Sequence, residues 1–471
     1  MIRTNHPLLQ PFTPTEGDRF DAIKAAHLLN RCGFGGTQEE IAEVLRAGPS
    51  EAVERLLDFP DAGADEQSQT DVPDFSGIEG YPKTFAERRK LFEGLSPQER
   101  QDLQQKLNAA NREAVFALVR WWLGRMTSGP YPLQEKLTLM WHGHFTTSAS
   151  DERSAWLMWQ QHETLRRYAG GNFRQFVHAI SRDPAMIDYL NNQQNRKGHP
   201  NENYARELME LFTLGIGNYS ENDIKEAARA FTGWGNDGDD FIFRRNFHDD
   251  GEKSFFGKRG NFDGHDIIDI ILGGEVSSRY IASKLYGWFA HDVNDESLAG
   301  ALGTALKQSN YELRPLLRTI LTSRGFYSEV AMFTQIKSPI QLLIGMVRQM
   351  GVRMPAPGDT RNFFQASGQM PLNPPNVKGW PGGRTWINTS TLFVRYNAGV
   401  RLAGTIEKNA LVPPGARAPS DVVNHWLTRL IQRPIAEDKR QLLVEAATPV
   451  NRDTARKVVE LIVSMPEYQL C

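Results

Sequence analysis

The sequence predicts a mainly α-helical protein, folded as one compact multi-helical domain with long ordered loops and at most one short β-hairpin, near residues 241–256. Three observations support this prediction. Helical periodicity recurs along most of the chain, strand-like alternation of apolar and polar residues is scarce, and no repeat of fixed period occurs. A chain of 471 residues is also long enough to bury a large core.

The first 60 residues are predicted to form N-terminal helices. The helical pattern runs from Arg19 to Phe59 and is interrupted by a Gly-rich turn at 33–36. Thr37 is placed to cap the second helix through a capping box with Glu40. The next segment, residues 61–83, is rich in Asp, Gly, Ser and Pro and is predicted to be a mobile loop.

Residues 84–235 are predicted to form a helical core. Its first helices are expected at 97–123 and 132–141, each starting at a proline. A signature helix follows at 202–214, with Asn201 as its N-cap and Gly215 where a left-handed residue ends a helix. Another helix is expected at 223–231, capped by Ser220 or Asn222.

Residues 236–266 change character and are predicted to be a Gly- and Asp-rich loop insertion. Within it, residues 241–243 and 254–256 have the composition of two strands that pair in one hairpin. The remaining residues, 267–471, are predicted to be C-terminal helices, interrupted by an ordered Pro/Gly-rich loop at 371–386.

The composition argues against several classes of function. The chain has 54 basic and 56 acidic residues and a net charge of −2, so no nucleic-acid partner is expected. No uncharged run reaches the roughly 18 residues of a membrane span. Cys32 and Cys471 are too few for a disulfide framework or a thiolate metal cluster. The N-terminal residues lack the apolar core of a secretory signal, so a cytoplasmic location is predicted.

The signature helix has one apolar and one charged face. The charged face carries Glu202, Arg206, Glu207 and Glu210. One interpretation is a solvated face with i,i+4 ion pairs. The other turns the carboxylates inward, where they need partners or a metal. The helix alone does not distinguish the two.

His142 and His144 are the strongest local candidates for metal ligands, because imidazole is a common ligand of divalent transition metals. Residues two apart point about 200° away from each other on a helix. Both can therefore face one ion only if the chain leaves the helix at Gly143. The alternative is that they are satisfied histidines of the core.

His248 and Asp249 lie in a loop with Lys253, and binding residues are common in such loops. The alternative is a capped turn in which Asp249 or Asp250 binds its own backbone before Gly251. The His-Asp dipeptide also invites comparison with metal phosphohydrolases, but a loop position does not match their helical ligands. The chain has no Glu-x-x-His placed as a di-iron bundle requires, and it has no phosphate-binding or nucleophile-elbow motif.

Seven sequence blocks, taken together and in order, resemble the bacterial family of domains of unknown function numbered 1800. The blocks are Leu28-Leu-Asn-Arg-Cys-Gly-Phe-Gly35, Trp141-His-Gly-His-Phe145, Pro184-Ala-Met-Ile-Asp-Tyr-Leu190, residues 201–215, Ala228-Arg-Ala-Phe-Thr-Gly-Trp234, His248-Asp249 with Gly251, and Pro374-Pro-Asn-Val-Lys-Gly-Trp-Pro-Gly-Gly383. The resemblance runs from about residue 25 to 405. It implies no settled activity, and many members of that family look exported. Because the candidate ligands fall within these blocks, the resemblance favours their meeting in one pocket.

Three hypotheses of function follow. In the first, His142, His144, Glu202, His248 and Asp249 hold a divalent Zn, Mn or Fe ion, Glu207 or Glu210 acts as base, Arg206 binds an anionic substrate, and the protein is a metal-dependent hydrolase. In the second, the same polar residues form a buried network in a non-catalytic helical scaffold that binds another protein. In the third, two histidines and a carboxylate hold iron in an oxidative enzyme.

Overall fold

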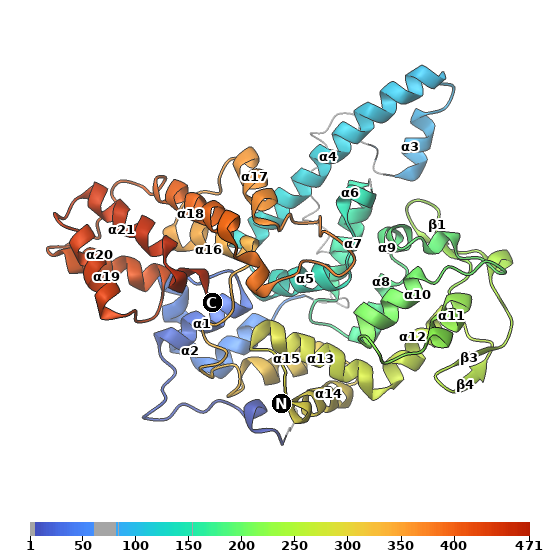
Figure 1. The fold of residues 1–471 in the computed structure, drawn as a ribbon, viewed down its shortest axis with the longest axis horizontal. Coiled ribbons are helices and arrows are strands. Elements are labelled where there is room, and N and C mark those ends of the chain that lie inside the picture. The colour runs from blue at the N-terminus through green and yellow to red at the C-terminus, as the bar shows by residue number, and fades with distance from the viewer. Residues whose placement is uncertain (1–4, 61–81, 83, 153) are drawn as a thin grey trace.

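The predicted mainly α-helical fold is confirmed in a computed structural model of the chain, which describes residues 5–60, 82, 84–152 and 154–471 (Figure 1). The predicted mobile loop at 61–83 lies outside the described residues, apart from Pro82. Among the described residues, no helix is both long enough and apolar enough to cross a bilayer.

The described residues of the first half of the chain are mainly helical. Its helices are η1 (Pro7–Leu9), α1 (Ala22–Cys32), α2 (Gln38–Leu57), α3 (Phe85–Leu91), α4 (Pro97–Ser128), α5 (Pro132–His144), α6 (Ala149–Glu152), α7 (Ala155–Arg167), α8 (Phe173–Ile180), α9 (Pro184–Tyr189), η3 (Asn192–Gln194), α10 (Asn203–Glu207), the π-helix η4 (Leu208–Thr213) and α11 (Glu221–Ala230).

The second half begins with two hairpins and then returns to helix. Its elements are β1 (Trp234–Asn236), β2 (Phe241–Phe243), η5 (Arg245–Phe247), β3 (Lys253–Phe255), β4 (Lys258–Gly260), α12 (Gly264–Gly273), α13 (Glu275–Phe289), α14 (Glu296–Gln308), α15 (Leu313–Leu321), α16 (Pro339–Met350), α17 (Pro357–Ser367), η6 (Gly383–Trp386), α18 (Thr389–Ala403), α19 (Pro419–Leu430), α20 (Glu437–Ala446), α21 (Arg452–Ser464) and η7 (Pro466–Gln469).

The described helices enclose two large hydrophobic cores, and a small third cluster lies between α1 and α2. One large core is built mainly from α8 to α15, and the other mainly from α4, α7 and α16 to α21. In Figure 1, α19 to α21 form one end of the molecule, the hairpins form the other, and α4 projects from the body with α3 beside it. Helix α5 lies between the cores: Leu137 and Trp141 belong to the first and Leu139 to the second.

Because both faces of α5 are covered, a polar side chain on it loses contact with water, and a charged one there needs partners within the protein. Glu135 is fully buried and accepts hydrogen bonds from Trp122 Nε1 at 3.0 Å, Arg125 Nε at 2.8 Å and Arg166 Nη2 at 3.2 Å. This carboxylate therefore connects three helices, α4, α5 and α7, through bonds to two cations and an indole.

The local capping signals are confirmed. Thr37 and Glu40 form the predicted capping box of α2, and Ser220 forms one with Asp223 at the start of α11. Helix α5 continues to His144, three residues beyond the predicted end, so the chain does not leave the helix at Gly143.

The predicted pairing of 241–243 with 254–256 is wrong. The structure has two antiparallel hairpins, β1–β2 and β3–β4, in place of the single one that was expected. Each strand pairs with the strand next to it in the sequence, because a short turn joins the two strands of each hairpin. In the first turn, Asp237 Oδ1 accepts hydrogen bonds from the backbone N–H groups of residues 239 and 240.

The signature helix is present but is not a regular α-helix. The helix begins at Asn203, one residue later than predicted, and its N-cap is Glu202, which makes no side-chain capping bond. The predicted cap, Asn201, does accept a hydrogen bond from the Asn203 N–H through Oδ1 at 3.0 Å, and Gly215 has the predicted positive φ, +84°. Between them, α10 passes directly into the π-helix η4. A π-helix is rare and is often found at functional sites.

Candidate functional site

The end of η4 is bonded by side chains from two other helices. A helix leaves its last carbonyl groups without intrahelical partners. Tyr280 of α13 donates its hydroxyl proton to the Leu211 carbonyl at 2.9 Å. His144 of α5 lies with Nε2 at 3.0 Å from the Phe212 carbonyl, which can only accept, so Nε2 carries the proton. The lone pair of His144 is therefore on Nδ1.

Lys284 lies against both of these side chains. Its Nζ is 3.0 Å from His144 Nδ1 and 3.3 Å from Tyr280 Oη. Because His144 and Tyr280 already donate to the helix end, each can only accept from the amine. A neutral amine has two N–H bonds and one lone pair. The two acceptors thus use both N–H bonds and leave the nitrogen lone pair unengaged.

Lys284 is exposed to solvent, yet desolvation by the surrounding protein lowers the pKa of its amine to about 8. Burial also lowers the pKa of Lys136 and of Lys337 to about 8, but both of those residues are almost fully buried. Among the lysines that the structure describes, Lys284 therefore combines a pKa of about 8 with access to solvent. We call Lys284, His144 and Tyr280 the lysine site.

Of the predicted catalytic residues, Glu207 ends α10 and Glu210 lies on η4, the helix whose end is bonded by His144 and Tyr280. Burial and the neighbouring Glu210 raise the pKa of Glu207, while Lys378 and Arg206 act in the opposite direction. Glu210 accepts a hydrogen bond from the Tyr219 hydroxyl at 2.9 Å. Burial, and then the charge of Glu210, raise the pKa of Tyr280 to about 12.

The loop at 371–386 packs on the end of α5. Gly379 has φ +79°, and a Cβ atom there would lie 2.2 Å from the carbonyl oxygen of Gly143. Only glycine permits this approach. The next residue, Trp380, has its ring 5.5 Å from that of His142. Two of the seven blocks noted in the sequence thus meet at this contact, and Lys378 is placed near Glu207 by the same loop.

His142 points away from His144 because both residues are in the helix. Its ring stacks on Trp122, with centroids 5.8 Å apart, and both ring nitrogens lack a hydrogen-bond partner. Burial lowers its pKa to about 4. The two histidines therefore do not face a common point.

His248 and Asp249 lie at the end of α11, away from the histidines of α5. His248 Nδ1 is 2.9 Å from the Thr232 carbonyl, and Thr232 Oγ1 accepts the Asp249 N–H at 2.8 Å. Asp249 accepts hydrogen bonds from Arg229 Nε at 2.8 Å and from the Gly251 N–H at 2.9 Å. The Arg229 guanidinium lowers the pKa of Asp249 to about 2. This geometry is the capped turn that the sequence left as an alternative.

Glu202 and Arg206 form an ion pair on the outer face of α10. Arg206 Nη2 is 3.1 Å from Glu202 and 2.9 Å from Glu221, and all three side chains are substantially exposed. This is the solvated i,i+4 interpretation of the charged face. Arg206 is consequently engaged by two carboxylates.

The structure does not bring the predicted metal ligands together. Among the described residues, no group of three or more His, Cys, Asp or Glu side chains is placed to hold a metal ion. The described residues therefore do not form a ligand set for the Zn, Mn or Fe ion expected from the sequence. Binding of that ion stays a prediction.

A family model described as a protein of unknown function (DUF1800) matches residues 27–470. The chain belongs to this family. No curated protein and no solved structure matches the chain. The match to DUF1800 confirms the resemblance seen in the seven blocks and extends it through the C-terminal helices, beyond the predicted limit near residue 405.

Sequence reasoning missed two members of the lysine site in this DUF1800 chain. Tyr280 and Lys284 are four residues apart on α13, a spacing that places two side chains on one helix face. This four-residue spacing is the one feature of the nearby sequence that points to the lysine site. It does not single out the pair, because many residues on helix surfaces have the same spacing. The sequence indicates the third member, His144, as a metal ligand, whereas the structure gives it a lysine amine as its partner.

Proposed function

We propose that this protein reacts with small aldehydes or ketones through an imine at Lys284. The observation that carries the proposal is the hydrogen bonding of the lysine site, in which both N–H bonds of a neutral amine are accepted and the lone pair is left for an electrophile. Lysine amines form Schiff bases with carbonyl substrates when desolvation keeps part of the amine neutral. Because Lys284 is exposed, a carbonyl compound can reach its amine from solvent.

The chemistry of this step balances within the site and its solvent. The Lys284 nitrogen attacks the carbonyl carbon and forms the C–N bond. Both amine protons then pass to the carbonyl oxygen, which leaves as water when the C=N bond forms. His144 Nδ1, at 3.0 Å from the amine, is placed to relay these protons. Tyr280 positions the amine from the other side.

The test is reductive labelling of the whole protein at pH 7 with benzaldehyde and cyanoborohydride, followed by peptide mass spectrometry. At pH 7 an amine of pKa 8 is about 10% neutral, against well below 1% for an ordinary lysine. We therefore expect Lys284 to be labelled at least about tenfold faster than Lys106, an exposed lysine of α4.

Matched variants make the labelling test decisive. Lys284→Arg keeps the positive charge and is expected to remove the fast labelling. Lys106→Arg is expected to leave the fast labelling of Lys284 unchanged. The Tyr280→Phe variant removes one acceptor and should move the pH at which labelling is half-maximal. Equal labelling rates for Lys284 and Lys106 would contradict the proposal.

The scaffold hypothesis is a second candidate function, favoured by a specific observation. His144 and Asp249 are each bonded to other parts of the chain, and Glu135 connects three helices in the interior. In a pure scaffold, Lys284 would serve only to hold His144 and Tyr280, the two side chains that bond the end of η4. Lys284→Met would then lower the melting temperature and no carbonyl compound would change the melting temperature of the wild-type protein.

The metal-dependent hydrolase stays a separate proposal, supported by the candidate ligands within the family blocks. It predicts one equivalent of Zn, Mn or Fe in the purified protein, and a fall in melting temperature after chelation. Elemental analysis and thermal unfolding with and without chelator measure both. Less than one tenth of an equivalent of metal, together with unchanged unfolding in chelator, would exclude it.

A further inference from the structure

A hollow of about 500 Å³ opens between α4 and α17, and none of its lining residues belongs to the lysine site. This volume lies within the range of small-molecule sites. One wall is a stripe of α4 in which Asn108, Arg112 and Phe116 recur at intervals of four residues. The opposite wall is formed by Arg361 and Gln365 of α17, also four residues apart.

The hollow is rich in hydrogen-bond donors. Among the described residues, neither Arg112 nor Arg361 has a carboxylate partner, and none of those that line the hollow is Asp or Glu. Asn373 Oδ1 accepts hydrogen bonds from Ser148 Oγ at 2.8 Å and from the Ser150 N–H at 3.2 Å. That bonding turns the amide NH₂ of Asn373 into a further donor for a ligand.

Part of the lining is apolar. Val115, Phe116, Met370 and Pro371 provide it, and the guanidinium carbon of Arg361 lies 5.8 Å from the centroid of the Phe116 ring. Stacking on an aromatic ring holds an arginine in place while its N–H groups remain free to bind. The hollow thus presents two planar cations beside an aromatic and aliphatic surface.

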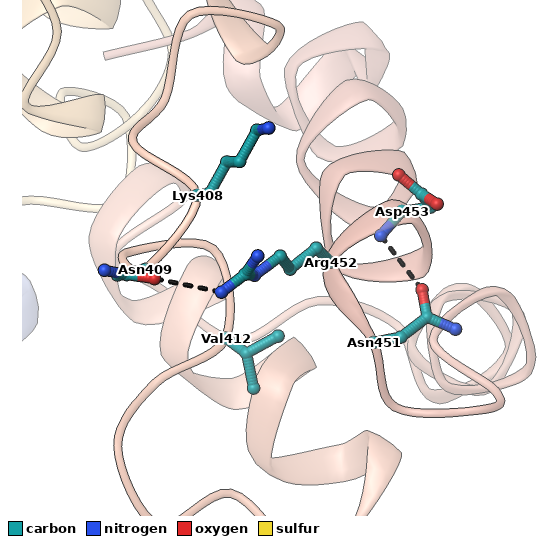
Figure 2. Close-up of a pocket in the computed structure, with 6 residues that line it drawn as sticks. All are labelled: Lys408, Asn409, Val412, Asn451, Arg452 and Asp453. Carbon is teal, nitrogen blue, oxygen red and sulfur yellow. Dashed lines mark hydrogen bonds between the residues drawn. The ribbon is translucent and has the colours of Figure 1, made fainter.

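A second hollow on the molecule lacks this combination. As Figure 2 shows, it is lined by Lys408 and Arg452 near the start of α21, but Arg452 Nη2 is already bonded to Asn409 Oδ1 at 3.0 Å. The carboxylate of Asp453 also lines it, and Val412 is its one apolar residue. Its charges are mixed, so it favours no particular ion.

We propose that the hollow between α4 and α17 binds a small carboxylic acid with an apolar or aromatic body. Arg112 and Arg361 bind the carboxylate, for which the planar guanidinium is well matched. Phe116 and Met370 cover the apolar body. Such a ligand uses both halves of the lining, whereas an inorganic anion would use only the arginines.

The test is calorimetric titration of the full chain with 4-phenylbutyrate. We expect saturable binding that is weakened at least about tenfold in Arg112→Gln and in Arg361→Gln, because each removes a charge-assisted hydrogen-bond donor. The neutral amide 4-phenylbutyramide should bind at least about tenfold more weakly than the acid. Both arginines are exposed, so these variants are expected to keep the wild-type melting temperature.

Arg120→Gln is the matched control. The Arg120 guanidinium carbon lies 5.9 Å from the centroid of the same Phe116 ring, but this residue does not line the hollow. Its replacement should leave binding unchanged. Absence of binding up to about 10 mM ligand, equal loss in all three variants, or tighter binding of inorganic phosphate than of 4-phenylbutyrate would overturn the proposal.

Discussion

Replacing Glu135 by glutamine is expected to lower the free energy of unfolding by about 3–5 kcal/mol. The side chain of Glu135 is 1% exposed, and its oxygens accept hydrogen bonds from Arg125, Arg166 and Trp122. Glutamine preserves the shape but removes the charge, which leaves two largely buried guanidinium groups without their shared anion. Urea unfolding at pH 7, followed by tryptophan fluorescence, measures the loss.

Glu163→Gln is the control for this prediction. Glu163 bonds the same cation, Arg166, at 2.9 Å, but it lies nearer the surface and pairs with no second arginine among the described residues. We expect a loss of about 1 kcal/mol from this variant. A loss from Glu135→Gln no larger than that from Glu163→Gln would show that the buried carboxylate does not hold α4, α5 and α7 together.

The helices could be predicted from the sequence because their signals are local. Thr37 with Glu40 and Ser220 with Asp223 lie three residues apart, so the capping bonds form within a single turn. The π-helix could not be predicted in this way. Its last carbonyls are bonded by His144 and Tyr280, which come from helices far away in the sequence. A regular α-helix was therefore expected where η4 is observed.

The candidate site could be predicted only in part, for a related reason. His144, Glu207 and Glu210 are candidates because of their residue types, which the sequence shows directly. Lys284 cannot be recognised in this way, because a lysine on an amphipathic helix is ordinarily a solvated surface residue. Its low pKa results from the protein that surrounds the amine in the folded state. That desolvation depends on long-range packing and leaves no mark in the residues nearby in sequence.

Asp183→Asn is expected to remove a pH dependence of stability. Asp183 is a buried N-cap of α9, and its Oδ1 accepts hydrogen bonds from the Met186 N–H at 2.9 Å and from Gln161 Nε2 at 3.1 Å. Burial raises its pKa to about 7. In the unfolded chain the pKa returns to about 4. Between these two values the folded protein binds the extra proton, so stability falls as the pH rises.

The size of the change in stability follows from the difference between the pKa of Asp183 in the folded and unfolded protein. Wild-type stability should fall by about 2–3 kcal/mol between pH 5 and 8 from this group alone, and the fall should level off above pH 8. Asparagine keeps the capping oxygen but cannot ionise. The difference between Asp183→Asn and wild type, measured by urea unfolding at pH 5, 6, 7 and 8, isolates Asp183 because all other titrating groups are common to both proteins. Parallel pH profiles would show that Asp183 is ionised in the folded protein throughout this range, and its carboxylate would then be stabilised by the two hydrogen bonds despite its burial.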